Sequence, residues 1–180
     1  MTTKDKIIEN IEIPDGVTLT IDRHTFNVKG PKGEIFKKFV HPNIKITLKE
    51  KSLNLESVRK HSKNEKRFLM TFSAHIKNMI QGVTEGFIYK LKICSGHFPM
   101  NVSIEGNNVI IKNFLGEKIP RKSKIALGVK AQVKGDEIII ESCDIALAGQ
   151  TASNIEQATR VKARDRRIFM DGIWITSKPE

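Results

Sequence analysis

The sequence contains only two cysteines, Cys94 and Cys143, and it has no long hydrophobic run. Nowhere do 18 apolar residues follow one another, so no segment is apolar enough to span a bilayer. The amino-terminal stretch MTTKDKIIENIEIPDG also lacks the apolar run that a secretion signal needs. We therefore expect a cytoplasmic protein without a membrane partner. Two cysteines are enough for one disulfide, but in a reducing compartment we expect both to be free, buried thiols.

Sequence motifs of enzymes and metal sites are also missing. The chain contains no GxxxxGKS or GxxxxGKT loop, no GxGxxG after a strand, no GxSxG and no HExxH. The five histidines stand at no ligand spacing from one another or from the cysteines, which argues against a zinc site. We therefore expect a protein that is not an enzyme and that uses no cofactor, metal or small-molecule substrate.

Acidic residues are few in comparison with basic ones. The chain has 31 Lys and Arg against 20 Asp and Glu, a net charge of +11, which favours an anionic partner: nucleic acid first, a membrane surface second. Cations gathered in several separate stretches suit a protein wedged among RNA helices better than one recognition helix in a groove. Those stretches are Lys29–Lys38, Arg59–Arg67, Lys112–Lys134 and Arg160–Arg167.

The last stretch, residues 160–167, is the densest, and we call it the basic arm. Its five cations occupy eight positions, with Asp165 as the only acid, and they repel one another unless a polyanion neutralises them. A solvated tail is the alternative. The apolar residues that follow argue against it, because a solubilising tail needs neither Phe169 nor Trp174, which we expect to anchor the arm as buried rings. The five cations are Arg160, Lys162, Arg164, Arg166 and Arg167.

Apolar periodicity predicts strands followed by one helix in each half of the chain. A capping box at Ser62 and Glu65 begins the first helix and Gly82 ends it, while Asp144 caps the second. His75 lies near the apolar face of the first helix, and we expect a packed histidine. The expected strands cover 17–22, 26–28, 35–40, 44–48 and 53–55, then 87–93, 102–104, 109–111, 125–133 and 138–140, with a short strand at 173–175.

The two halves also repeat each other in sequence. VKGPKGEIFKKF from Val28 aligns with IKNFLGEKIPRK from Ile111, and two further blocks match at a spacing of 85 residues. A steady spacing predicts a duplicated unit of about 84 residues, although chance similarity between basic, strand-rich segments is the alternative. The expected fold class is α+β, with two duplicated domains, 1–84 and 85–180, each an antiparallel sheet with a helix packed on one face.

The carboxyl-terminal residues resemble a known family. The chain resembles the ribosomal protein L-six family of the large subunit, in its archaeal and eukaryotic form, over nearly its whole length. The family usually has tyrosine where this chain has Trp174, which keeps a ring but loses a hydroxyl. GFIYKLKICSGHFPM looks archaeal. The residues that carry the resemblance are Gln157, Val161, Arg164, Arg167, Phe169, Asp171, Gly172, Ile173, Trp174, Ile175 and Lys178, together with HFPMNV at 97–102 and NFLGEK at 113–118.

The resemblance implies a function as well as a fold. Members have two similar α+β domains, are not enzymes, and bind large-subunit rRNA near the sarcin–ricin loop and the base of the factor-recruiting stalk, beside neighbouring ribosomal proteins. A free-standing RNA-binding or RNA-processing factor is the alternative, and an RNA-modifying enzyme would need a cofactor pocket. Phe98 either stacks on a base or packs under its loop. The expected RNA contacts are Ser95, His97 and Phe98 in the Ser95–Pro99 loop, the arm cations Arg160, Lys162, Arg164, Arg166 and Arg167, and Lys178.

Overall fold

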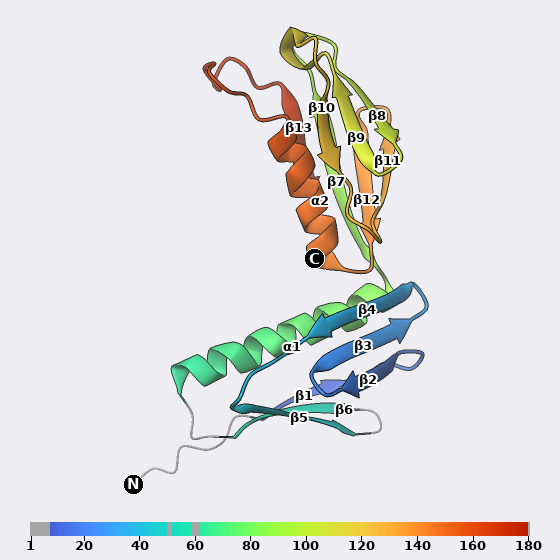
Figure 1. The fold of residues 1–180 in the computed structure, drawn as a ribbon, viewed down its shortest axis with the longest axis vertical. Coiled ribbons are helices and arrows are strands. Elements are labelled where there is room, and N and C mark those ends of the chain that lie inside the picture. Colours follow the sequence, from blue (N-terminus) through green and yellow to red (C-terminus); the bar gives the residue numbers. More distant parts are fainter. Residues whose placement is uncertain (1–7, 50–51, 59–61, 180) are drawn as a thin grey trace. The chain divides into compact units, whose positions relative to one another are not determined.

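The structure, a computed structural model, describes residues 8–49, 52–58 and 62–179. The chain divides into two compact units, Met1–Glu85 and Gly86–Glu180, which we call the amino unit and the carboxyl unit. Within these ranges, each unit combines antiparallel strands with one α-helix (Figure 1). The expected α+β class is therefore confirmed.

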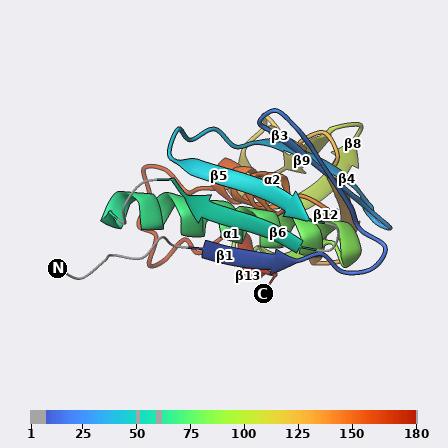
Figure 2. The same ribbon diagram turned by 90° about the horizontal axis from the view of Figure 1, so that it is seen from below.

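The amino unit contains two three-stranded antiparallel sheets and the long helix α1 (Lys63–Thr84). One sheet has the order β1-β6-β5, and these strands lie side by side in Figure 2. The other is the meander β2-β3-β4, and α1 packs against strands of both sheets. The bounds are β1 (Ile8–Glu12), β2 (Thr18–Asp22), β3 (Thr25–Gly30), β4 (Gly33–Lys38), β5 (Ile44–Lys49) and β6 (Ser52–Ser57).

The carboxyl unit contains a four-stranded sheet, a three-stranded sheet and the helix α2 (Ile145–Ala158). The orders are β11-β12-β7-β13 and β10-β9-β8, all antiparallel. The small residues Ala148 and Ala152 are fully buried, which lets α2 lie close to the sheet. The bounds are β7 (Phe87–Cys94), β8 (Asn101–Glu105), β9 (Asn108–Lys112), β10 (Arg121–Lys124), β11 (Lys130–Lys134), β12 (Glu137–Ser142) and β13 (Gly172–Ser177), with a short 3₁₀ turn at Phe114–Gly116.

The two units share one topology. Strands β5-β6-β1 correspond to β11-β12-β7, and the meander β2-β3-β4 corresponds to β8-β9-β10, with the helix following in each case. Equivalent strand pairs also keep the same register and the same spacing in sequence. Leu55 faces Ile46 as Ile140 faces Ala131, 85 positions later, and Val28 faces Leu19 as Ile111 faces Val102, 83 positions later. The predicted duplication is therefore visible in strand order and in register.

One part of the sequence repeat has no structural counterpart. Gly33 faces Gly30 across the tight turn between β3 and β4. Gly116 instead lies in the 3₁₀ turn of the longer connection between β9 and β10. The two Gly-Glu pairs therefore occupy different places, and their match in sequence is fortuitous.

Several predicted boundaries are wrong. Strand β1 was not predicted, and the strand expected over 125–133 is interrupted, because Val129 donates to the carbonyl of Ala126 in a turn and β11 begins only at Lys130. Gly82 does not end α1, which continues to Thr84. The two additional residues contact the sheet, since the carbonyl of Val83 accepts a hydrogen bond of 2.9 Å from the backbone of Lys32.

Three side chains are less buried than expected. His75 is exposed, although its ring stacks on that of Phe39 with centroids 6.1 Å apart. Cys94 and Cys143 form no disulfide within the part of the chain that the structure describes, but both are half-buried rather than buried. Both predicted N-caps are present: Ser62 accepts from the backbone of Glu65, and Asp144 accepts from that of Ala146. The second half of the expected capping box is replaced by other contacts, since the Glu65 carboxylate accepts from Asn43 and Ser57.

Candidate nucleic-acid interface

The basic arm lies between α2 and β13, in a segment without regular secondary structure. In Figure 1 it is the orange-red loop that leaves the end of α2. Val161 is buried and holds the segment against the unit, whereas the cationic side chains of the arm are exposed. The exposed cations are Arg160, Lys162, Arg164, Arg166 and Arg167.

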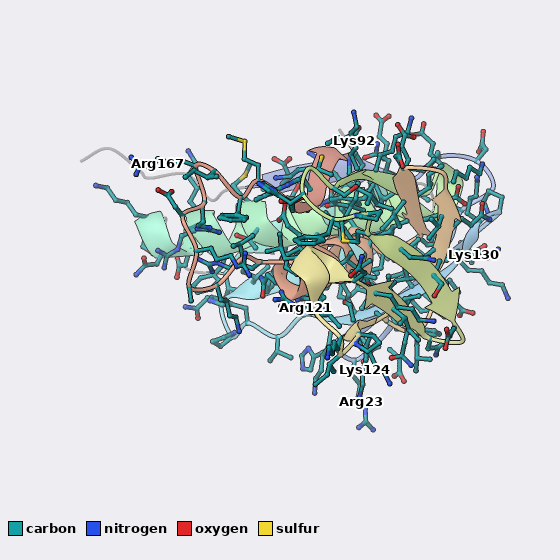
Figure 3. The ribbon with its side chains drawn as sticks, turned by 90° about the horizontal axis from the view of Figure 1, so that it is seen from above. Arg23, Lys92, Arg121, Lys124, Lys130 and Arg167 are labelled. Carbon is teal, nitrogen blue, oxygen red and sulfur yellow. The ribbon has the colours of Figure 1, made fainter. Side chains whose placement is uncertain are left out.

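Arg121 on β10 supports the segment where it leaves α2, and no sequence pattern singled this residue out. Its Nη1 donates to the carbonyl oxygens of Ala158, at 2.8 Å, and Arg160, at 3.1 Å. Ala158 is the last residue of α2, so its carbonyl lacks a partner within the helix, and Arg160 directly follows the C-cap residue Thr159. Its Nε and Nη2 donate to the carboxylate of Glu117 at 2.8 and 2.6 Å, and its guanidinium carbon lies 4.2 Å from the ring centroid of Phe114. Arg121 is labelled in Figure 3.

This contact also changes the chemistry of Glu117. The hydrogen bond from Arg121 lowers the pKa of the Glu117 carboxyl, against the opposing effect of burial. Glu117 therefore stays ionised and holds the guanidinium in place. Among the many cations of the stretch 112–134, only the fold distinguishes Arg121, because the carbonyl oxygens of Ala158 and Arg160 that it binds lie 37 and 39 residues away in sequence.

Asp171, which lies between the basic arm and β13, connects this segment to the Ser95–Pro99 loop. Its side chain is 4% exposed. Its carboxylate accepts hydrogen bonds from the backbone of Gly96, from the backbone of His97 at 3.0 Å and from Nδ1 of His97 at 2.6 Å. Burial raises the pKa of Asp171, but these hydrogen bonds outweigh it and leave the pKa below its ordinary value. An ionised carboxylate thus fixes two segments that are 75 residues apart in sequence.

A group of stacked side chains extends this connection. The rings of His97 and Phe169 are stacked, with centroids 4.6 Å apart and planes 28° apart. The guanidinium carbon of Arg164 lies 4.9 Å from the centroid of the Phe169 ring. The structure therefore brings His97 of the predicted loop into contact, through Phe169, with Arg164 of the predicted arm.

The other loop residues are also accessible. Ser95 is exposed, and Phe98 is 46% exposed. The ring of Phe98 lies against Gly116, where an added Cβ would be 3.6 Å from the ring. Phe98 therefore packs on one side and is open to solvent on the other.

Lys178 is not part of this cluster. Strand β13 pairs with β7 so that Gly172 faces Cys94, next to the loop, and Ser177 faces Lys90. Lys178 follows Ser177 and so lies at the opposite end of the strand, on the order of 20 Å from Gly172 at ~3.3 Å per residue. It is exposed but separate from the arm and the loop.

Arg167 differs from the other arm cations because it has an internal partner. Its Nη2 lies 2.8 Å from Oδ2 of Asp165, and its Nε lies 3.2 Å from Oδ1. The hydrogen bonds from Arg167 lower the pKa of Asp165, so the acid is charged and offsets part of the arm's positive charge. The remaining four cations carry most of the arm's excess charge.

Trp174 contradicts the expectation of a buried anchor. It is 42% exposed, although it lies in β13. The reason is the two-residue period of a strand: Ile173 and Ile175 turn toward the core, so Trp174 points the other way. The residues that anchor the segment are Ile173, Val161 and Asp171, all buried, together with the half-buried Phe169.

Some alternatives find no support in the described residues. Residues 8–49, 52–58 and 62–179 contain no group of three or more His, Cys, Asp or Glu that could hold a metal ion. In the same ranges, no helix is long and apolar enough to cross a membrane. Of the basic stretch Arg59–Arg67, residues 59–61 lie outside the described part.

Comparison with known proteins identifies close relatives. The family model of ribosomal protein L6 matches residues 13–86 and 98–172, once in each unit. The chain is 49% identical to large ribosomal subunit protein uL6 of Aeropyrum pernix over 94% of this chain and 93% of the relative. It is 46% identical to uL6 of Methanobrevibacter smithii over 99% of both chains, and 44% identical to uL6 of Methanosarcina mazei over 96% and 98%. These matches confirm the resemblance seen in the carboxyl-terminal motif and its archaeal character.

Proposed function

Because this chain belongs to the ribosomal protein L6 family, we propose that its carboxyl unit binds large-subunit rRNA through the basic arm and the Ser95–Pro99 loop. The protein is a structural component of the large ribosomal subunit and not an enzyme. The proposed binding region is the neighbourhood of the sarcin–ricin loop and the base of the factor-recruiting stalk. Neighbouring large-subunit proteins, including those of the stalk base, are the proposed protein partners.

The observation that carries the proposal is the double attachment of the basic arm. Arg121 holds the segment where it leaves α2, and Asp171 holds it where it meets the loop. Exposed cations on a segment fixed at both ends lose less conformational entropy on binding than the same cations on a loose tail. This arrangement supports a preformed surface for phosphate groups.

The chemistry of this surface favours backbone contacts. Arginine guanidinium groups match phosphate oxygens and release counterions when they bind them, which supplies most of the affinity of such interfaces. Phosphate contacts position a protein on RNA without reading its sequence. We expect the fold of the RNA, more than its base sequence, to determine where the arm binds. Ser95, His97, Phe98, Arg160, Lys162, Arg164, Arg166 and Arg167 are the proposed contacts, with Lys178 as a separate, weaker one.

Sedimentation distinguishes this proposal from a free-standing RNA-binding factor. The tagged full chain, expressed in archaeal cells, should sediment with large subunits in a sucrose gradient and stay with them after a high-salt wash. A protein found mainly at the top of the gradient would support the free-standing factor instead.

Directed hydroxyl-radical cleavage tests the location. The exposed Ala163 is replaced by Cys in a background with Cys94→Ala and Cys143→Ala, and a radical-generating iron chelate is attached to the new thiol. In reconstituted large subunits, rRNA cleavage should concentrate around the sarcin–ricin loop. A matched probe at the exposed Lys45→Cys of the amino unit is the control, and equal cleavage there from both probes would contradict the proposed location.

A further inference from the structure

Trp174 is the only tryptophan of the chain, and it lies in the wall of a small hollow beside the basic arm. The hollow measures about 160 Å³, below the roughly 300–1,000 Å³ of a small-molecule site. Two arm cations, Arg160 and Arg166, line it together with Glu156, Gln157, Thr159 and Ile173. The carboxylate of Glu156 accepts a hydrogen bond of 3.3 Å from the backbone of Ile175. Its size and openness suit one planar group that remains attached to a larger molecule.

The indole ring is held in position before any ligand arrives. Its Nε1 donates to the carbonyl oxygen of Met170 at 3.2 Å. Its Cε2 and Nε1 atoms lie over Gly172, where an added Cβ would approach them to 3.4 Å. Because the ring is already ordered, stacking on it costs little side-chain entropy.

The groups around the hollow match the parts of a nucleotide. An aromatic ring and guanidinium planes stack on bases, and a glutamine amide both donates and accepts at base edges. Two arginines beside the ring also favour the phosphate of the same nucleotide. A neighbouring protein would gain from the exposed indole too, but the paired arginines favour an anionic ligand.

We propose that this hollow receives one unpaired base of the RNA, stacked on Trp174 while Arg160 and Arg166 contact its phosphate groups. The inference rests on the proposed rRNA binding and extends it. The arm cations alone would recognise RNA only by the charge of its phosphates, whereas the hollow would also prefer an unpaired nucleotide.

The fluorescence of the single tryptophan tests the proposal directly. The probes are a ten-nucleotide oligoadenylate and an abasic phosphodiester oligomer of the same length, each titrated into the full chain at low salt. Both probes should bind through the arm, as measured by anisotropy of a dye on the oligomer. Only the oligoadenylate should quench Trp174, because only bases can stack on the indole.

Two variants complete the test. Trp174→Ala should lose roughly 5- to 100-fold in affinity for the oligoadenylate and keep its affinity for the abasic oligomer, while Trp174→Tyr should recover most of the loss. Thermal melts confirm that each variant folds, and if Trp174→Ala does not, the wild-type quenching and the tyrosine variant decide.

The outcomes separate this inference from the proposed function. The base site is wrong if the two oligomers bind with equal affinity and have the same effect on the fluorescence of Trp174. That result would still agree with charge-driven binding by the arm. If RNA does not change the emission of Trp174, the exposed indole does not stack on a base, and a contact with a neighbouring protein would be the better explanation for it. If neither oligomer binds in a salt-dependent way, rRNA binding by the arm itself is wrong.

Discussion

The amino and carboxyl units share a framework, but they differ along one edge of the main sheet. In the amino unit, β1 forms the edge of its sheet among the described residues. In the carboxyl unit, the equivalent strand β7 is covered by β13. The chain that leads from α2 to β13 contains the basic arm. The arm cations therefore lie in a segment that the amino unit lacks, whereas the Ser95–Pro99 loop corresponds to the connection between β1 and β2.

A second difference lies between the last two strands of the meander. β3 and β4 are joined by a tight turn, whereas a longer connection that contains Phe114 and Glu117 joins β9 to β10. Both residues contact Arg121, which in turn holds the root of the arm. The two units therefore share a framework of strands and a helix, and the carboxyl unit alone adds the longer connection and the strand β13, which hold an exposed cationic segment at both ends.

Removal of the arm cations should produce the largest change. We expect the variant with Arg160, Lys162, Arg164, Arg166 and Arg167 replaced by alanine to lose affinity for a large-subunit rRNA fragment by a factor on the order of 10³ at 0.15 M salt. It should fail to enter large subunits in sucrose gradients. It should melt like the wild type because all five side chains are exposed. If this variant enters large subunits normally, the arm would not distinguish the function of the carboxyl unit from that of the amino unit.

Removal of the Asp171 carboxylate should have the next largest effect. Asp171→Ala leaves the backbone N–H groups of Gly96 and His97 without their acceptor, and we expect a loss of about 1–3 kcal/mol in the free energy of unfolding. RNA affinity should fall as well, because the loop and the arm are no longer joined. Chemical denaturation measures the first effect, and Asp165→Ala on the exposed arm is the control that should leave the denaturation midpoint unchanged.

The acid dependence of stability follows from the same residue. Because folding lowers the pKa of Asp171, its contribution is fully present above the unfolded-state value of about 3.9 and is lost as the pH falls below that value through the folded pKa. The wild type should therefore lose more stability than Asp171→Asn between about pH 5 and pH 2. Parallel acid-unfolding curves would show that the hydrogen bonds to Asp171 do not stabilise the ionised form.

Loss of Arg121 should have a smaller effect on stability. Arg121→Ala removes the hydrogen bonds to the carbonyls of Ala158 and Arg160 and the pair with Glu117, so we expect a loss of about 1–2 kcal/mol. Lys122→Ala, the exposed neighbour, is the matched control and should melt like the wild type. If Arg121→Ala melts at the same temperature as Lys122→Ala, the connection between β9 and β10 does not support the arm.

The smallest expected effect is a difference in amide hydrogen exchange. β7 is bonded on both sides, by β12 and β13, so nearly all of its amides should exchange slowly. β1 is bonded only to β6 among the described residues, so about half of its amides should exchange fast. Equal protection of the two strands in nuclear magnetic resonance would mean that the open edge of β1 is covered in solution.

Sequence alone predicted the framework well because local patterns determine it. Alternating apolar residues and two helix caps gave most strands and both helices, and the spacing of 85 residues reflects a real common register. Boundaries failed where tertiary contacts decide them, as at Gly82, where the contact between Val83 and Lys32 continues the helix.

The site was predicted less completely, for the same reason. The charge density of the arm is a local property, so its exposed cations were recognisable. Arg121 and Asp171 act through partners far away in sequence, and no periodicity reveals such pairs. Trp174 was assigned to the core from its residue type, although the period of β13 already placed it opposite Ile173 and Ile175.

The most direct test of the account compares the salt dependence of rRNA binding in two matched variants of the full chain. One carries the five arm substitutions, and the other replaces five exposed cations of the amino unit, Lys29, Lys38, Lys45, Lys49 and Lys66, by alanine. Each lost phosphate contact should flatten the slope of log K against log salt concentration by about 0.7–0.9. Because Arg167 is partly neutralised by Asp165, we expect the arm variant to flatten the slope by roughly 3 units and the amino-unit variant to change it by less than about 1. Equal slopes for the two variants, or an arm variant with the wild-type slope, would contradict the claim that the arm is the part of this protein that holds rRNA.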